Sequence, residues 1–208
     1  MEGRITLEAI IIHGVLLAFG LILPLGVQNV FIFQQGAYHK DFIRALPAVL
    51  TAAICDLVLI TLAIGGVSVI VLANPVFKTV LITVGCLFLI YMGWVTWNTK
   101  NQQGTMEGEA FTGRKQIIFA ASVSLLNPHA ILDTIGVIGT SSLQYSGMDR
   151  WVFAAACVAV SWIWFFGLAA AGRFFGKIDQ TGKLMSLVNK CSAIIIWGVA
   201  VLLIKSLL

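Results

Sequence analysis

Residues 125–133 read Leu-Leu-Asn-Pro-His-Ala-Ile-Leu-Asp and lie in the middle of a long apolar segment. Pro128 cannot donate a backbone hydrogen bond to the preceding turn and clashes with it, so we expect a helix through this segment to break there. Such a break frees backbone carbonyls at membrane depth, which is tolerated where they are buried in protein or line a cavity. His129 and Asp133 are four residues apart and share one face of a continuing helix. Asn127, His129 and Asp133 are therefore candidate binding residues.

Residues 23–29, Leu-Pro-Leu-Gly-Val-Gln-Asn, form a similar motif in the first apolar segment. Pro24 predicts a second helix break, and Gly26 allows a ligand or another backbone to approach closely. Gln28 and Asn29 supply hydrogen-bond donors and acceptors without charge, which suits the headgroup of an amino acid.

Asp56 lies about ten residues into another apolar segment. Placing a carboxylate at this depth costs about 2.5–3.5 kcal/mol on insertion scales. An acid in such a position normally has a partner, faces a water-filled cavity or belongs to an ion pathway. The alternative is a neutral or hydrogen-bonded Asp that serves helix packing alone.

The composition indicates an all-α, polytopic membrane protein. The chain has 208 residues, of which 59% are hydrophobic and 11% charged, and its mean hydropathy is +0.97. A soluble domain has about 25% charged residues, so a cytosolic catalytic domain or an enzyme is not expected. A spanning helix needs about 20 apolar residues, and six such segments stand out: Ile10–Gln35, Leu46–Leu72, Val76–Trp97, Ile117–Gly139, Trp151–Gly172 and Leu187–Ile204.

The two proline motifs occupy equivalent positions in the two halves of the chain. Sliding the sequence by 104 residues lays Pro24 on Pro128 and Asn29 on Asp133. A three-span unit that is repeated after an odd number of crossings must be inverted, as in many secondary transporters. We therefore predict two inverted three-helix repeats, residues 1–97 and 117–208, joined by a polar cytoplasmic linker over 98–116, with the substrate site between broken helices near the midplane.

The distribution of basic residues predicts the orientation in the membrane. The connections after spans one, three and five hold nine Lys and Arg, whereas the opposite side holds four. The positive-inside rule places the richer connections in the cytoplasm and both termini outside, provided that the fourth segment spans fully and is not re-entrant.

The two buried acids, without a basic residue at similar depth, favour a cationic or zwitterionic substrate. Neither a cofactor nor nucleic acid is expected as a partner, because the basic residues are spread thinly and no phosphate-binding GxxxxGK[ST] motif is present. A titratable Asp allows protons to exchange for a cationic substrate. The expected partners are a small-molecule substrate, protons, the lipid bilayer and, as a guess from small-residue patches, a second copy of the chain.

The two proline motifs and Cys55-Asp56-Leu57-Val58 together resemble the LysE family of amino-acid exporters, most closely its lysine and arginine exporter branch. The resemblance covers nearly the whole chain. It implies a multi-pass protein of the bacterial inner membrane that exports lysine, arginine or both by proton- or potential-coupled antiport, with functional positions at Asp56, Asn127, Pro128, His129 and Asp133. The chain departs from the family at Val27, where proline is usual, which leaves the substrate preference open.

Two alternatives use the same scaffold. Relatives of this family export neutral amino acids, and others in the wider superfamily handle divalent metal ions, for which two acids and His129 are possible ligands. The amides at Gln28 and Asn29 favour an amino acid over a metal.

Overall fold

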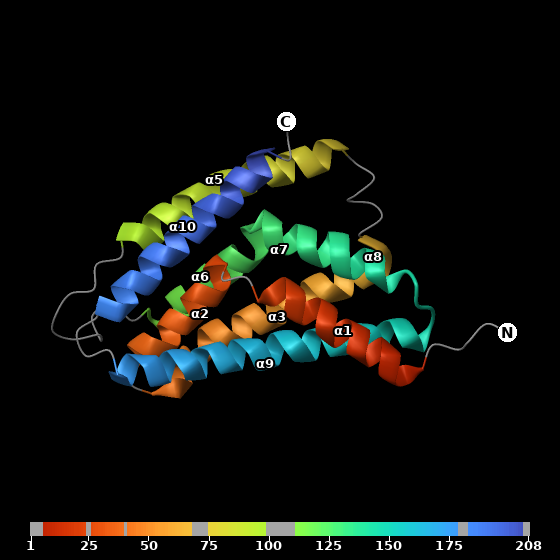
Figure 1. Ribbon diagram of the computed structural model, residues 1–208, viewed down its shortest axis with the longest axis horizontal. Helices are drawn as coiled ribbons and strands as arrows, with labels where there is room; N and C mark the ends of the chain where they lie inside the picture. The colour runs from red at the N-terminus through yellow and green to blue at the C-terminus, as the bar shows by residue number, and fades with distance from the viewer. Residues whose placement is uncertain are drawn as a thin grey trace.

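The computed structural model describes residues 6–23, 26–39, 41–67, 75–98, 111–178 and 183–205, and every regular element in these ranges is helical (Figure 1). Two unbroken helical segments, Phe42–Gly66 and Met148–Ile178, are long and apolar enough to cross a membrane, and two bent helix pairs bring the number of candidate spans to four. The expected all-helical membrane bundle is confirmed.

The first expected span is a broken helix. It consists of α1 (Leu7–Ile22) and α2 (Val27–Tyr38), whose axes are bent by 81°. Gly26 precedes α2 in an extended conformation. The predicted interruption is present, although Pro24 itself lies outside the described residues.

The second span begins with a short 3-10 helix, η1 (Phe42–Ala45), and continues through α3 (Leu46–Leu62) into a π-helical turn, η2 (Ala63–Val67). The apolar pattern predicts a helix to Leu72. However, Gly66 has a φ of +100°, a left-handed backbone conformation that residues other than glycine rarely adopt. The regular helix is therefore kinked at Gly66, and residues 68–74 lie outside the described part.

The fourth span is also broken, at the predicted place. Its first part is α6 (Gly113–Leu126), after which Asn127 is extended, as expected for a residue before proline. Pro128 opens α7 (Pro128–Leu132), where its missing N–H costs nothing. A π-helical turn, η4 (Asp133–Ile138), and α8 (Gly139–Ser142) complete the span, and its two parts are bent by 61°.

The remaining expected spans are continuous helices. They are α5 (Pro75–Asn98), α9 (Met148–Ile178) and α10 (Lys183–Lys205), of 24, 31 and 23 residues. At 1.5 Å per residue α5 and α10 are each about 35 Å long, enough to cross a hydrocarbon core of about 30 Å. The six predicted segments thus correspond to the six helical units of the described chain.

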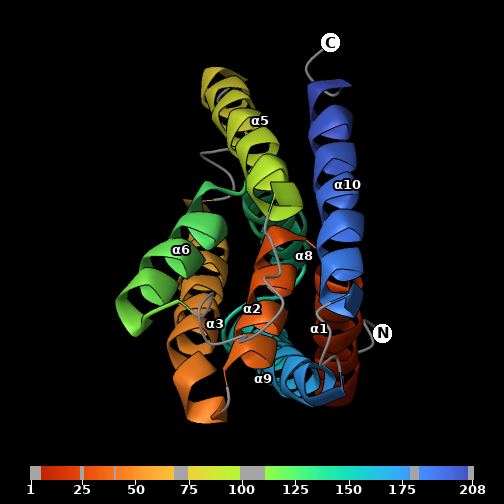
Figure 2. The same ribbon diagram turned by 90° about the vertical axis from the view of Figure 1, so that its left-hand side faces the viewer.

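The helices pack in pairs that relate the two halves. The first span packs on the fifth, the fourth on the second, the third on the sixth, and the second on the fifth. If spans one, two and three are exchanged with spans four, five and six, the same four pairs result. In Figure 1, α5 and α10 lie side by side above α9, and Figure 2 shows α2 in the middle of the bundle.

The helix ends on either side of the three basic connections lie together. The ends of α2, α5 and α9 and the starts of α6 and α10 are at the left of Figure 1, whereas the start of α1, α8 and the start of α9 are at the right. The bent fourth span therefore runs from one side of the molecule to the other instead of returning to the side on which it begins.

Candidate functional site

A cavity of about 130 Å³ collects the predicted site residues. Its polar wall contains five of the six candidate binding residues, namely Gln28, Asn29, Asp56, Asn127 and Asp133. Gly26 and Ala130, which correspond under the 104-residue shift, also line it. The sixth candidate, His129, is on α7, but its side chain is not among those described. Three sequence motifs that are far apart in the chain thus meet at one place, between the two broken spans and α3.

The start of α2 forms one side of the cavity. Gly26, Val27 and Gln28 line it, and the first N–H groups of α2 receive no capping bond from a described side chain. Within the described structure a Cβ added to Gly26 meets nothing within 4 Å, so this helix end is accessible from the cavity. The N-terminus of a helix carries a partial positive charge and free backbone donors, which together attract anions.

The two neighbouring amides of α2 have different contacts. Asn29 donates from Nδ2 to the carbonyl oxygen of Ile22 at 2.8 Å, so it bonds a carbonyl that the break frees at the end of α1. Gln28 is close enough to interact with the Asp56 carboxyl, yet its Nε2 has no hydrogen-bond partner of normal geometry among the described residues. Gln28 therefore presents a buried donor beside an acid in the cavity wall.

The acids come from different halves of the chain. Asp56 lies on α3 and is partly exposed to the cavity, and Asp133 begins the π-helical turn η4 and is also partly exposed. A π-helical turn inside an α-helix is common at functional sites. Residues 128–132 between the helix break and this turn are α-helical, and whether the side chains of His129 and Asp133 share a face stays a prediction.

Sequence reasoning missed several polar residues of the cavity wall. Thr134, Cys157 and Ser161 also line it. Ser161 donates to the carbonyl oxygen of Val158 in its own helix, and Cys157 donates to the carbonyl oxygen of Gly14. Small polar residues of this kind are common in spans and carry no sequence signal that separates a cavity wall from ordinary packing.

The electrostatic character of the cavity is acidic. No lysine or arginine is among the described residues that line it, whereas two carboxyl groups are. Its apolar wall is formed by residues such as Ala18, Ile22, Ile60, Leu89 and Ile196. A small cavity of this composition is suited to a compact cation, or to a zwitterion whose carboxylate end meets the start of α2.

A metal centre has no support in the described part of the chain. No group of three or more His, Cys, Asp and Glu side chains with metal-binding geometry occurs there.

Broken helices that meet an acidic cavity inside a polytopic bundle are typical of membrane transporters. The comparison with known families agrees: residues 19–207 match the LysE type translocator family, and the chain belongs to that family. The expected resemblance is confirmed, and the protein is a transporter and not an enzyme.

Relatives cover most of the chain. It is 66% identical over 190 residues to YisU of Bacillus subtilis, which is provisionally named as an amino-acid transporter; the match covers 91% of this chain and 86% of YisU. The arginine exporter protein ArgO of Pectobacterium atrosepticum is 32% identical over 204 residues, with 95% of this chain and 97% of ArgO covered. ArgO of Klebsiella pneumoniae is 32% identical over 200 residues, with 93% and 92% covered. No solved structure matches the protein.

Proposed function

We propose that this protein is a secondary exporter of basic amino acids, arginine or lysine or both, across the bacterial inner membrane. The observation that carries the proposal is the cavity in which Asp56 and Asp133, one acid from each half of the chain, meet the amides and the free helix start of α2. The names of the ArgO relatives support arginine as a substrate, at 30–32% identity.

The two ends of such a substrate match different walls of the cavity. The guanidinium or ammonium group of the side chain pairs with the carboxylates of Asp56 and Asp133, which are the charges available for a cation. The α-carboxylate accepts hydrogen bonds from the first N–H groups of α2 and from Nε2 of Gln28. His129 and Asn127 remain candidates for contacts on the α7 side.

Export of a cation requires coupling. Moving one positive charge outward against an inside-negative potential costs about 2.3 kcal/mol per 100 mV. Competition of a proton and a basic amino acid for Asp56 or Asp133 exchanges inward proton movement for outward substrate movement. The acids then act alternately as proton carriers and as substrate ligands.

The arrangement in the membrane belongs to the same proposal. The basic connections after spans one, three and five face the cytoplasm, both termini face outward, and residues 1–97 and 117–208 act as inverted repeats around the cavity. The pairing of the spans supports this division, because exchange of the halves preserves it. A homo-oligomer remains a prediction.

The proposal is tested by efflux from cells that are loaded with arginine- or lysine-containing dipeptides. Cells with the intact protein, the Asp133→Asn variant and an empty vector are compared, with threonine as a neutral competitor. We expect faster arginine or lysine efflux with the intact protein and a loss of at least about tenfold in Asp133→Asn, since a hydrogen bond to a charged group contributes about 1.5–3 kcal/mol.

Other results point to the alternatives. Strong competition by threonine favours a neutral amino-acid exporter. Equal efflux from all three strains contradicts amino-acid export of this kind, and resistance to divalent metal ions is then the property to compare.

A further inference from the structure

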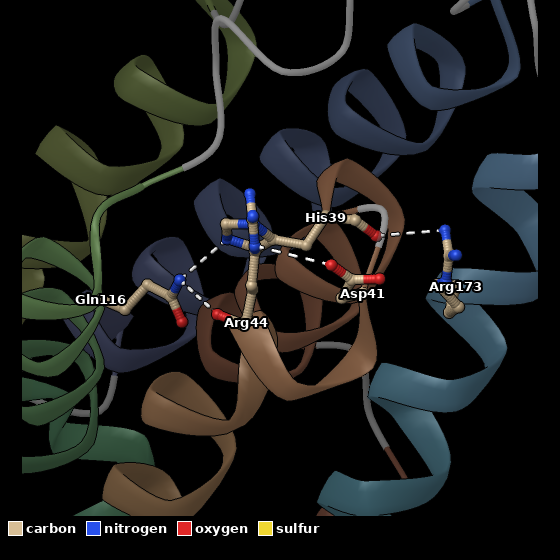
Figure 3. A network of polar contacts seen from close by, with 5 residues as sticks. All are labelled: His39, Asp41, Arg44, Gln116 and Arg173. Carbon is tan, nitrogen blue, oxygen red and sulfur yellow. Dashed lines mark hydrogen bonds and ion pairs between the residues drawn. The ribbon is translucent and has the colours of Figure 1, made fainter.

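Gln116 is a fully buried side chain that connects four segments at one end of the bundle, outside the substrate cavity (Figure 3). Its Nε2 lies 2.8 Å from Nε2 of His39 and 2.9 Å from the carbonyl oxygens of both Arg44 and Phe111. Its Oε1 accepts a hydrogen bond from the backbone N–H of Ala48 at 3.2 Å. These contacts, which we call the Gln116 latch, join α6 to the end of α2, to η1, to the first turn of α3 and to Phe111, two residues before α6.

The orientation of the Gln116 amide is fixed by its backbone partners. Turning the amide over would place its NH₂ group against the N–H of Ala48 and its oxygen against the carbonyls of Arg44 and Phe111. All three contacts would then be repulsive, so Nε2 must be the atom that faces His39. This nitrogen shares two hydrogens among His39 and the two carbonyls and cannot accept a hydrogen bond, so an N–H on the facing nitrogen of His39 finds no acceptor in Gln116. The neutral ring with its proton on Nδ1 is the form that fits this contact.

Protonation of His39 therefore breaks the latch. A charged imidazole has donors on both nitrogens, and the N–H on Nε2 would point at the Gln116 NH₂ group. The carbonyl of Phe111 is the described group that favours the charged ring, and a protonated ring competes with Gln116 for this carbonyl. Protonation of His39 thus makes its contact with Gln116 repulsive and weakens the hydrogen bond of Gln116 to Phe111.

The positive charges around His39 also disfavour the charged form of its ring. Burial lowers the pKa of His39, the Phe111 carbonyl raises it, and the positive charge of Arg44 lowers it again. From α9, Arg173 donates to the backbone carbonyl of His39 at 3.2 Å and adds positive charge on that side. Asp41 pairs with Arg44 at 3.7 Å, but both side chains are two-thirds exposed, so this pair offsets little.

We propose that His39 is a proton-binding site that controls the Gln116 latch, and that its protonation separates the ends of α2 and α3 from α6 beside the basic connections. The proposal goes beyond the transport of any one substrate, since it holds whichever ligand the cavity takes. His39 is then a proton-sensitive group in addition to the acids of the cavity, and it lies at the end of the bundle beside the basic connections.

The direction of the pH dependence follows from the lowered pKa. His39 binds a proton more tightly when the Gln116 latch is broken than when it is formed. The form with the latch intact therefore gains stability as the pH rises. The latch is complete above the ordinary histidine pKa of about 6.5 and is lost as the pH falls below it.

The test measures the distance between spin labels on both sides of the latch, in the full-length protein in lipid nanodiscs without substrate. Labels are attached to Ile43→Cys in η1 and Lys115→Cys in α6, both exposed positions, with the exposed Cys191 replaced by serine. We expect a single short distance at a pH of about 8 and a second, longer population at a pH of about 5.5. In His39→Gln, whose amide oxygen accepts from Gln116 but takes up no proton in this range, the short distance persists at both values.

Two further variants complete the design. Gln116→Leu removes the latch and is expected to show the longer population at both pH values. His13→Gln, at the opposite end, where His13 bonds the hydroxyl of Tyr145 at 2.7 Å, is the matched control and keeps the pH response of the parent. A distance that does not change with pH in the parent, or that changes equally in His39→Gln, overturns the proposal. Neither result bears on which amino acid the protein carries.

Discussion

At the scale of single residues, two neighbouring amides of the cavity wall that look equivalent in the sequence have different contacts. Asn29 donates a hydrogen bond to the carbonyl oxygen of Ile22 and so stabilises the break between α1 and α2. Gln28, one residue earlier, keeps a buried donor at the cavity wall and interacts with Asp56. Adjacent residues on a helix differ by about 100° in direction, so two polar neighbours need not serve one purpose, and the sequence alone could not assign the two roles.

Gln28→Leu tests the binding of the substrate carboxylate. The substitution removes the donor while it keeps a similar volume, and we expect a several-fold rise in the KM for arginine, corresponding to about 1 kcal/mol for one hydrogen bond. Agmatine, which is arginine without its carboxylate, serves as the control competitor in vesicle uptake assays. Its inhibition constant is expected to stay the same in Gln28→Leu; an equal loss for both compounds would place Gln28 at the cationic end instead.

At the scale of elements, the helix breaks were predictable and the helix ends were not. Pro128 excludes a hydrogen bond within its helix and forces Asn127 into an extended conformation, so the bend of the fourth span follows from local chemistry. The π-helical turn at Asp133 and the kink at Gly66 are not marked by the apolar pattern, which continues past both. Hydrophobicity shows which segments are buried, but not where their hydrogen bonding changes.

The crossing of α2 and α9 depends on glycines. Within the described structure, a Cβ added at Gly172 would collide with the backbone of Phe33, and one added at Gly36 with the backbone of Ala169. Gly172 belongs to the small-residue patch 167–172, which predicts helix packing within or between subunits, and at this position it packs inside one chain. Glycine is required here because backbone, and not a flexible side chain, fills the space.

Gly172→Ala is expected to lower the thermal stability of the purified protein, because α2 and α9 must move apart. An overpacked position of this kind costs about 1–3 kcal/mol. Gly167→Ala, on the same helix, is the matched control, since nothing described lies within 4 Å of its added Cβ. Alanine in a helix interior is favoured over glycine, so Gly167→Ala should leave the melting temperature unchanged or raise it. Equal melting temperatures for the two variants contradict the close crossing.

At the scale of the whole molecule, one contact joins positions of the two halves that are equivalent under the sequence shift. The shift of 104 residues pairs Gly93 with Trp197, and in the structure the Trp197 ring lies against Gly93 and donates to the carbonyl oxygen of Ile90 at 3.2 Å. Equivalent residues that touch one another are expected near an axis that relates two repeats. The motifs could be predicted from the sequence, whereas the meeting of Asp56 with both of them required the fold.

The orientation of the bundle predicts which positions are accessible from outside. In the Cys191→Ser background, cysteines at Leu143 and Met148 should react with a membrane-impermeant maleimide on intact spheroplasts, whereas cysteines at Ile43 and Lys115 should react only after the membrane is opened. All four positions are exposed in the structure, so differences in reactivity report the side of the membrane. The reverse pattern contradicts the orientation expected from the positive-inside rule.

The most direct test of the account is counterflow of labelled arginine into proteoliposomes loaded with unlabelled arginine. The purified protein, Asp56→Asn and Asp133→Asn are compared, with lysine, threonine and a divalent metal ion as external competitors. The account predicts rapid uptake by the parent, inhibition by lysine but not by threonine or the metal, and loss of uptake in both variants. Uptake by the parent that persists in both Asp→Asn variants would contradict the claim that the two carboxylates of the cavity bind the substrate.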